Sequence, residues 1–149
     1  MFQPGTLDGQ TVLITGGGTG LGRAMAERCA GLGARVGVVG RRPEPLAETV
    51  SAIAAAGGRA AWVSADVRDP EAVARAVDAV EGELGGLTAL VNNAASNFLA
   101  PTKDLSPNAF QAVVEIVLHS TFFVTTEVGQ RWIAHSSGSN VLSIVTTYA

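Results

Sequence analysis

Three glycines at fixed spacing are the clearest sign of chemistry in this sequence. The segment TGGGTGLG, residues 15–22, follows an apolar stretch and precedes a helical one. Gly16 allows a tight turn, Gly20 lets the backbone approach a phosphate, and Gly22 lets the helix pack closely on a sheet. The start of that helix also offers free N–H groups and the positive end of a dipole. The segment therefore predicts a site for the pyrophosphate of a dinucleotide.

A pair of arginines predicts which dinucleotide is preferred. The sequence after the second apolar stretch is VVGRRPE, with Gly40 where an acid would accept hydrogen bonds from a ribose 2′-hydroxyl. Arg41 and Arg42 follow, and a guanidinium can hold a 2′-phosphate through paired, charge-assisted bonds or stack on adenine. We therefore expect NADP(H). The alternative is that both arginines are only solvated charges before a helix.

Alternating strands and helices are predicted to position these groups. Apolar stretches favour strands at 11–15, 34–40, 59–65, 87–93 and 140–145. Such strands, alternating with helices, predict a doubly wound parallel α/β sheet (a Rossmann fold) with strand order 3-2-1-4-5. The ligand crevice is expected at the carboxyl ends of the strands.

The helices carry their own signals. Asp69-Pro70 and Ser106-Pro107 each fit an N-cap followed by a first-turn proline. The first helix is expected to end at Gly33. The last is expected over about 107–134, and its inner side is predicted to carry Phe110, Val113, Val114, Val117 and Thr121.

Composition limits the classes of function. The chain has 149 residues, 47% of them hydrophobic, and a net charge of −3, which suits one domain over residues 1–149. No basic cluster indicates nucleic acid or a membrane surface, and no apolar run is expected to span a bilayer. The N-terminus lacks signal-peptide features, so a cytoplasmic location is expected. His119 and His135 lack metal-ligand spacing, so no metal site is expected.

These motifs resemble the short-chain dehydrogenase/reductase family. The spacing T-G-x-x-x-G-x-G, NNAA at 92–95 and DV at 66–67 match its pattern. Asp66 could instead cap a turn, and Asn92 and Asn93 could be turn residues that hold the sheet. The motifs and the arginine pair together predict cofactor contacts at Thr15, Gly16, Gly18, Thr19, Gly20, Leu21, Gly22, Arg41, Arg42, Asp66, Val67, Asn93, Ala94 and Ala95.

The resemblance narrows further in the last third of the chain. Most family members use a serine, a tyrosine and a lysine in Y-x-x-x-K, often with a helix asparagine. Here Thr146 falls near the serine position and Val117 at the asparagine position. The segments NNAASNFLAPTKDLSPNAF, EIVLHSTFFVTTEVG and LSIVTTYA resemble the 2,4-dienoyl-CoA reductases, in which a valine replaces the asparagine. Tyr148 and Asn97 match residues of that branch.

The resemblance implies a reaction and several alternatives. NADPH would reduce a dienoyl-CoA thioester, with Tyr148 and Asn97 at the thioester oxygen and Tyr148 in proton transfer. Tyr148 could instead be an ordinary tyrosine at a strand end, Asn97 a loop residue and Thr146 a strand residue. The lone lysine, Lys103, lies in a loop far ahead of Tyr148. We expect the catalytic lysine beyond residue 149, and little turnover by this piece alone.

Two other functions stay open. One is reduction of a ketone or ketoacyl thioester by a related short-chain reductase. The other is an inactive NADP-binding module or fragment. Assembly into a tetramer through the helix at 107–134 is implied by the resemblance, and an apolar, unpaired edge is expected on the fifth strand. The sequence does not indicate the acyl chain length or how CoA is held.

Overall fold

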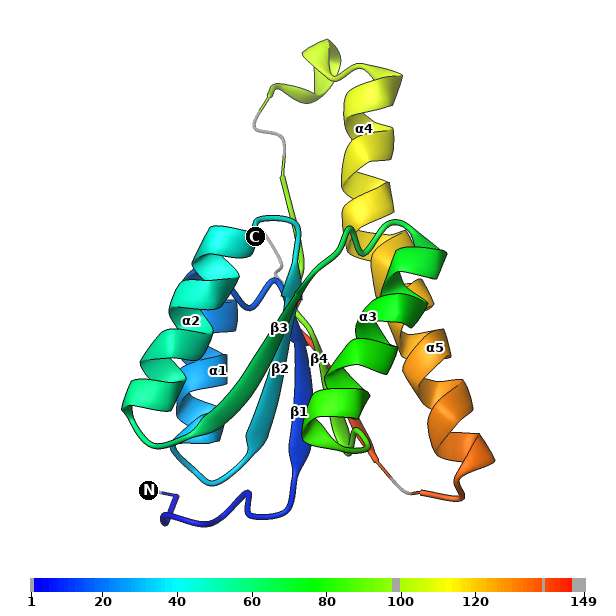
Figure 1. Ribbon diagram of the computed structural model, residues 1–149. Coiled ribbons are helices and arrows are strands. Elements are labelled where there is room, and N and C mark those ends of the chain that lie inside the picture. Colours follow the sequence, from blue (N-terminus) through cyan, green and yellow to red (C-terminus); the bar gives the residue numbers. More distant parts are fainter. Residues whose placement is uncertain (1, 98–99, 138, 146–149) are drawn as a thin grey trace.

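A five-stranded parallel sheet organises the computed structural model, which describes residues 2–97, 100–137 and 139–145. The strand order is β3-β2-β1-β4-β5 and every pairing is parallel. Helices α1 and α2 cover one face, and α3 and α5 cover the other (Figure 1). The predicted doubly wound fold and strand order are therefore confirmed. In chain order the elements are β1 (Thr11–Thr15), α1 (Gly20–Ala30), β2 (Arg35–Gly40), α2 (Pro43–Ala55), β3 (Arg59–Ser64), α3 (Pro70–Leu84), β4 (Ala89–Asn92), the 3₁₀ turn η1 (Thr102–Asp104), α4 (Pro107–Val114), the π-helical turn η2 (Glu115–His119), α5 (Ser120–Ala134) and β5 (Asn140–Ser143).

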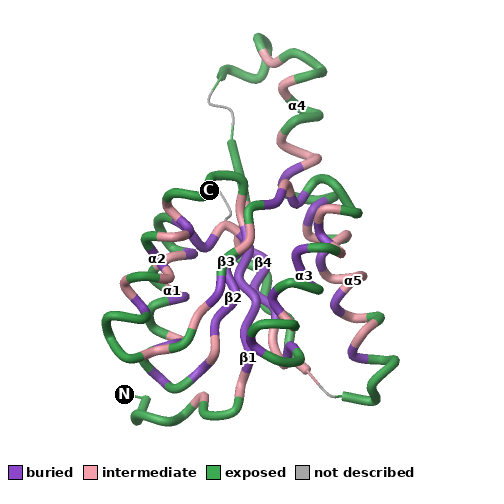
Figure 2. The backbone as a smooth tube through the Cα atoms, viewed as in Figure 1, coloured by how far each residue is buried: buried purple, intermediate pink, exposed green. Residues whose placement is uncertain are grey.

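The centre of the sheet is buried on both faces because the inner positions of β1 and β2 are apolar. Successive residues of β1 point to opposite faces, so Leu13 packs toward α3 and α5 while Val12 and Ile14 pack toward α1 and α2. Figure 2 shows this buried layer in purple along the strands. Each face of the sheet therefore has its own hydrophobic cluster. The buried central strands hold in place the loops that follow their carboxyl ends.

Local signals set the start of α3 and of α4. The Asp69 carboxylate accepts a hydrogen bond from the Glu71 N–H at 2.9 Å, and the Ser106 hydroxyl accepts one from the Ala109 N–H at 3.1 Å. Both predicted N-caps are thus present. Helix α1 ends at Ala30 rather than at Gly33. The three residues that follow form a turn, which closes with Gly33 at a φ of +101°.

The predicted inner side of the long helix is wrong. The helix does run from 107 to 134, but Phe110 and Val117 are 59% and 41% exposed, and Val113, Val114 and Thr121 are only partly buried. The buried residues instead recur every fourth position, at Ile116, Ser120, Val124, Val128 and Trp132. Two causes combine. Helix α4 extends beyond the sheet and buries nothing, and η2 is a π-turn that changes the helical phase.

The same helix bears on the expectation that no apolar run spans a bilayer. By length and composition alone, the stretch Pro107–Ala134 is long and apolar enough to cross a membrane. Its polar residues are mostly uncharged Ser, Thr, Asn and Gln, so a high mean hydropathy arises without a continuous apolar run. A helix that covers one face of a sheet can meet the same criterion, and α5 packs against α3 and β4.

The expected apolar edge of the sheet is present within the described residues. Strand β5 pairs with β4 along one side, and all four of its residues are exposed. Val141 and Leu142 are 47% and 53% exposed. The edge of β5 therefore has no neighbouring strand in the part of the chain that the structure describes.

Candidate functional site

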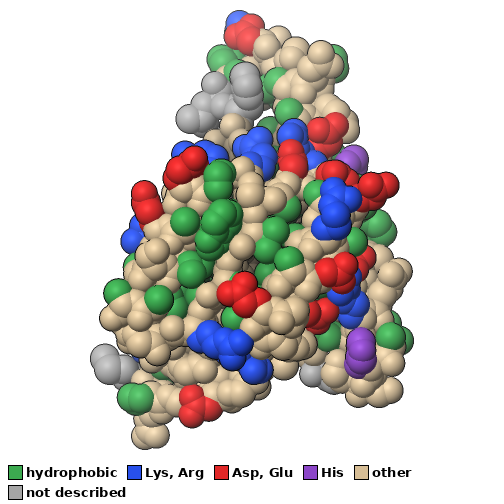
Figure 3. Space-filling model, in the orientation of Figure 1, with side chains coloured by type: hydrophobic (Ala, Val, Ile, Leu, Met, Phe, Trp, Pro, Cys, Tyr) green, Lys and Arg blue, Asp and Glu red, His purple; other side chains and the backbone are tan. Residues whose placement is uncertain are grey.

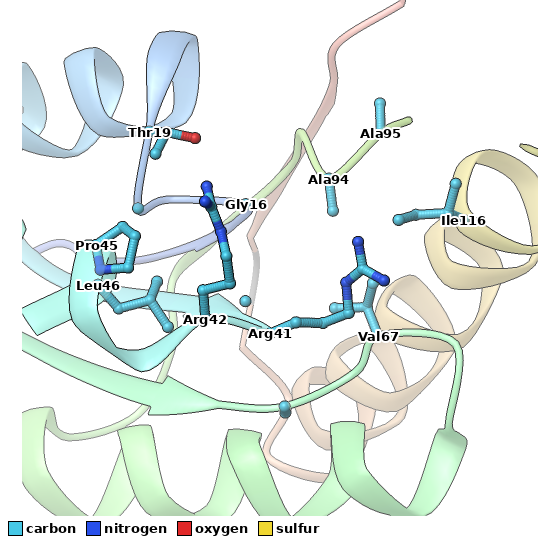
Figure 4. Close-up of a pocket in the computed structure, with 13 residues that line it drawn as sticks. Gly16, Thr19, Arg41, Arg42, Pro45, Leu46, Val67, Ala94, Ala95 and Ile116 are labelled. Atoms are coloured by element: carbon cyan, nitrogen blue, oxygen red, sulfur yellow. The ribbon is translucent and has the colours of Figure 1, made fainter. Parts of the chain in front are cut away.

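A cavity of about 430 Å³ lies at the carboxyl ends of the strands. It is lined by the phosphate loop after β1, the arginine turn after β2, the first turn of α2, the segments after β3 and β4, and one residue of η2 (Figure 4). This is where the fold predicts a ligand. The lining residues are Gly16, Gly18, Thr19, Gly40, Arg41, Arg42, Pro45, Leu46, Ala65, Val67, Ala94, Ala95 and Ile116.

The phosphate loop is shaped by glycines that tolerate no side chain. Gly16 has a φ of +68°, as its predicted turn requires. A Cβ on Gly22 would overlap the carbonyl oxygen of Gly16 and crowd the Asn93 amide, so this glycine allows α1 to start directly against the loop. Gly20 also has a positive φ, +54°, but the space around it is open. Its predicted phosphate contact stays a prediction.

Backbone donors of this loop are free to bind an anion. Thr19 is the N-cap of α1, and its side chain makes no capping hydrogen bond. Within the described residues, the N–H groups of Gly18 and Thr19 donate to no protein acceptor. These donors and the helix dipole both favour a negative charge at this end of the cavity.

Contacts between β1 and the end of β4 hold the loop in place. The Thr15 hydroxyl oxygen accepts hydrogen bonds from the N–H groups of Asn93 at 3.0 Å and Ala94 at 2.9 Å. The Asn93 amide in turn donates to the carbonyl of Thr15 at 3.0 Å. On the other face, the Asn92 amide donates to the Thr125 hydroxyl of α5 at 2.9 Å. The two asparagines therefore join strands and helices, as one of the two interpretations of NNAA expected.

The arginine turn presents two cations to the cavity. Arg41 and Arg42 are exposed, and within the described residues neither forms an ion pair with a carboxylate. In Figure 4, Arg42 extends toward the phosphate loop, and Arg41 extends toward Val67 and Ile116. The two guanidinium groups therefore approach the cavity from one side and remain available to an anion.

Asp66 is already engaged by a nearby cation. Its carboxylate accepts a hydrogen bond from the Arg68 backbone N–H at 3.0 Å and pairs with the Arg68 guanidinium at 2.6 Å. These contacts, led by the guanidinium hydrogen bonds, lower the pKa of Asp66 below its usual value. Arg68 also lies 3.9 Å from the Glu115 carboxylate in η2. Asp66 therefore caps the turn, as one of its two interpretations expected. Its contact with adenine stays a prediction.

Of the predicted catalytic residues, the structure describes only Asn97. Asn97 is exposed in the segment after β4 and does not line the cavity. Thr146 and Tyr148 lie outside the described residues. Lys103 is exposed and pairs with its neighbour Asp104 at 2.9 Å, as expected for a solvated charge.

The predicted cofactor contacts divide into two groups. Gly16, Gly18, Thr19, Arg41, Arg42, Val67, Ala94 and Ala95 line the cavity, whereas Thr15, Gly20, Leu21, Gly22, Asp66 and Asn93 do not. Three of the second group contact the phosphate loop on the side away from the cavity: Thr15, Gly22 and Asn93. Leu21 is 68% exposed. Pro45, Leu46, Ala65 and Ile116 were not predicted to line the cavity. Pro45 and Leu46 lie in the first turn of α2, close after the arginine turn, so a helix starting at Pro43 could have indicated them.

Comparison with known proteins supplies the family context. A sequence model described as short chain dehydrogenase matches residues 10–148. An uncharacterized oxidoreductase of Caenorhabditis elegans is 49% identical over 98% of this chain and 47% of its own length. Another protein of that organism, named "Probable 2,4-dienoyl-CoA reductase 3", is 42% identical over 100% of this chain and 49% of its own length. The chain thus spans about half the length of these curated relatives.

Solved structures agree with the observed fold. A citronellol catabolism dehydrogenase of Pseudomonas aeruginosa is 37% identical, with a TM-score of 0.90 over 98% of this chain and 59% of its own. A variant of actinorhodin polyketide ketoreductase, solved with NADPH, is 31% identical, with a TM-score of 0.87 over 95% of this chain and 54% of its own. The described part of the chain therefore corresponds to a little over half of each of these structures.

Proposed function

The chain belongs to the short-chain dehydrogenase family, and from this premise we propose that it supplies the cofactor-binding part of an NADPH-dependent 2,4-dienoyl-CoA reductase. The observation that carries the cofactor preference is that Arg41 and Arg42 line the cavity and form no ion pair within the described part of the chain. The substrate class is supported by the relative named as a 2,4-dienoyl-CoA reductase and by the sequence around Asn97, Val117 and Tyr148.

The residues of the cavity fit a dinucleotide with a 2′-phosphate. Free N–H groups at the start of α1 suit the pyrophosphate. Gly40 offers no carboxylate to a ribose 2′-hydroxyl, and no negative charge to repel a phosphate there. Arg41 and Arg42 can neutralise that phosphate through charge-assisted hydrogen bonds. In the space-filling view, Lys and Arg side chains (blue) are visible, together with Asp and Glu side chains (red), at the end of the molecule from which α4 projects (Figure 3).

The proposed chemistry assigns separate tasks to the chain's residues. Bound NADPH would supply a hydride to one carbon of the conjugated thioester. Tyr148 and Asn97 would donate hydrogen bonds to the thioester oxygen, where negative charge develops as the hydride arrives. Tyr148 would take part in delivering the proton that completes the reduction. Thr146 would stand in for the family's serine as a further hydroxyl donor. Cytoplasmic location and assembly into a tetramer stay predictions of the sequence.

A second candidate function is reduction of a ketone or ketoacyl thioester. The structural similarity to a polyketide ketoreductase favours it. The valine at 117, where the sequence pattern of most family members has asparagine, argues against it. The two candidates share the cofactor, so they differ only in the bond that receives the hydride.

Affinity for reduced nucleotides tests the cofactor preference. We expect the purified protein to bind NADPH about tenfold or more tightly than NADH, because two cations face the extra phosphate. Replacing both Arg41 and Arg42 by Gln should remove that preference and leave NADH binding within about twofold. The matched control is Lys103→Gln, which removes an exposed cation that does not line the cavity. Equal wild-type affinity for the two nucleotides would overturn the proposal.

Oxidation of NADPH tests the substrate class. A 2,4-dienoyl-CoA and a 3-ketoacyl-CoA of equal chain length would be compared by the loss of NADPH absorbance. Preference for the dienoyl-CoA would support the proposed reductase, and preference for the ketoacyl-CoA would favour the second candidate. Little oxidation is expected of residues 1–149 alone, so binding of NADPH without oxidation by either would indicate a nucleotide-binding module only in a chain that intact mass shows to be complete.

A further inference from the structure

The turn that carries both arginines is very short. Strand β2 ends at Gly40 and helix α2 begins at Pro43, so only Arg41 and Arg42 connect them. Arg42 precedes a proline and has an extended backbone, with φ −99° and ψ 114°, as residues before proline do. The helix side of the turn is therefore constrained by Pro43. The orientation of Arg41 depends on what holds the strand side.

Strand β3 holds that side through two consecutive carbonyl groups. The Ala65 N–H donates to the carbonyl of Gly40 at 2.9 Å, which extends the ladder one step past the end of β3. The Ser64 hydroxyl then donates to the carbonyl of Arg41 at 3.1 Å. Ser64 is exposed and does not line the cavity. Its hydroxyl therefore contacts the arginine turn from outside the cavity.

We propose that Ser64 is a positioning residue for Arg41 and thereby contributes to the preference for NADPH over NADH. The inference rests on the proposed function, in which Arg41 contacts the 2′-phosphate. A hydrogen bond to the Arg41 carbonyl limits rotation of the peptide that follows Arg41. The guanidinium is then closer to its binding position before the nucleotide arrives, and less freedom is lost on binding.

The effect should be confined to the 2′-phosphate. Among the residues that the structure describes, Ser64 makes no hydrogen bond to the phosphate loop or to the segment after β4, and these are the parts of the cavity that suit groups common to both nucleotides. Loss of the Ser64 hydroxyl is therefore expected to weaken NADPH binding and to leave NADH binding nearly unchanged. A purely structural role at the end of β3 would weaken both equally.

Threonine and valine at position 64 provide a matched test. The two side chains have nearly the same shape and both suit a strand, but only threonine keeps the hydroxyl. Dissociation constants for NADPH and NADH would be measured by fluorescence titration, with Ser64→Ala as a third variant without added bulk. We expect Ser64→Thr to keep the NADPH:NADH affinity ratio within about twofold of wild type. Ser64→Val and Ser64→Ala should lower it severalfold, with about tenfold as the upper limit that one hydrogen bond sets.

Three outcomes would overturn the inference. One is an unchanged ratio in both Ser64→Val and Ser64→Ala, and another is an equal loss of affinity for NADPH and NADH. The third is a lowered ratio in Ser64→Thr as large as that in Ser64→Val, because the hydroxyl would then not be the cause. If wild type itself does not distinguish the two nucleotides, the proposed cofactor preference falls as well. The wild-type titration alone identifies that case, so the two failures are distinguishable.

Discussion

Strands β1 and β5 flank the same neighbour, β4, yet they differ in how far their residues are buried. All five residues of β1 are buried, and all four residues of β5 are exposed. Both strands contain adjacent Val and Leu residues, so hydrophobicity does not explain the contrast. Strand β1 has a neighbour on each side and helices over both faces, whereas β5 pairs on one side only within the described residues. Burial of a strand therefore depends on its place in the sheet as well as on its composition.

The contrast extends to the regions around the two strands. Elements β1 to β4 pack into two hydrophobic clusters and surround most of the cavity. Helix α4 buries no residue, and the π-turn contributes only Ile116 to the cavity. Because few apolar contacts hold α4 and β5, we expect their amide hydrogens to exchange faster than those of β1.

Truncation of one leucine on β4 and one on β5 is expected to give the largest difference between a buried and an exposed strand. Leu90 on β4 is 1% exposed and Leu142 on β5 is 53% exposed. We expect Leu90→Ala to lower the free energy of unfolding by about 2–5 kcal/mol, since it leaves a cavity in the core. Leu142→Ala should cost less than about 1 kcal/mol. Urea unfolding measures both. Equal costs would mean that Leu142 is covered in solution and that the contrast between the strands is wrong.

A pair of helical glycines sharpens the contrast between the packed start of α1, behind the phosphate loop, and the solvent-facing surface. A methyl group on Gly22 would overlap the carbonyl oxygen of Gly16, whereas one on Gly82 in α3 would meet open space. We expect Gly22→Ala to cost about 1–3 kcal/mol through overpacking and to weaken NADPH binding. Gly82→Ala should add about 0.5–1 kcal/mol of stability, because alanine favours a helix. Thermal unfolding with and without NADPH would check both, and a harmless Gly22→Ala would contradict the described loop geometry.

The smallest expected effect concerns the ionic contacts that link the segment after β3 to the π-turn η2. Arg68 lies between Asp66 and Glu115 there. The folded-state pKa of Asp66 is lowered, chiefly by hydrogen bonds from Arg68. Its stabilising contribution is therefore present above the unfolded pKa of about 3.9 and is lost as pH falls through the lower folded value. Because the pair is partly exposed, Asp66→Asn should cost less than about 1 kcal/mol at neutral pH.

Chemical unfolding at several pH values checks this dependence. The difference between wild type and Asp66→Asn should shrink as pH falls below about 4. Arg68→Gln removes the cation that lowers the pKa of Asp66. In a protein that carries Arg68→Gln, the effect of Asp66→Asn on stability should therefore depend less on pH. A difference that is the same at neutral and acidic pH would show that Asp66 acts through shape or turn geometry rather than through its charge.

The sequence by itself determined the features that depend on neighbouring residues. Continuous apolar stretches identified the strands, and their alternation with helices favoured the strand order that the structure confirms. Asp69 and Ser106 were recognisable as N-caps because capping is a contact between residues two or three positions apart. Gly16 and the arginine pair were recognisable from their positions after the first and second strands.

Only the tertiary structure decided the contacts between distant segments. Thr15 and Asn93 meet although 78 positions separate them, and Ser64 reaches Arg41 across a strand pair. The buried side of the long helix was mispredicted because its phase depends on the π-turn and on how far the helix extends past the sheet. Ile116 lines the cavity for the same reason. Local chemistry follows from short spacing along the chain, whereas helical phase and long-range contacts follow from the packing of all elements together.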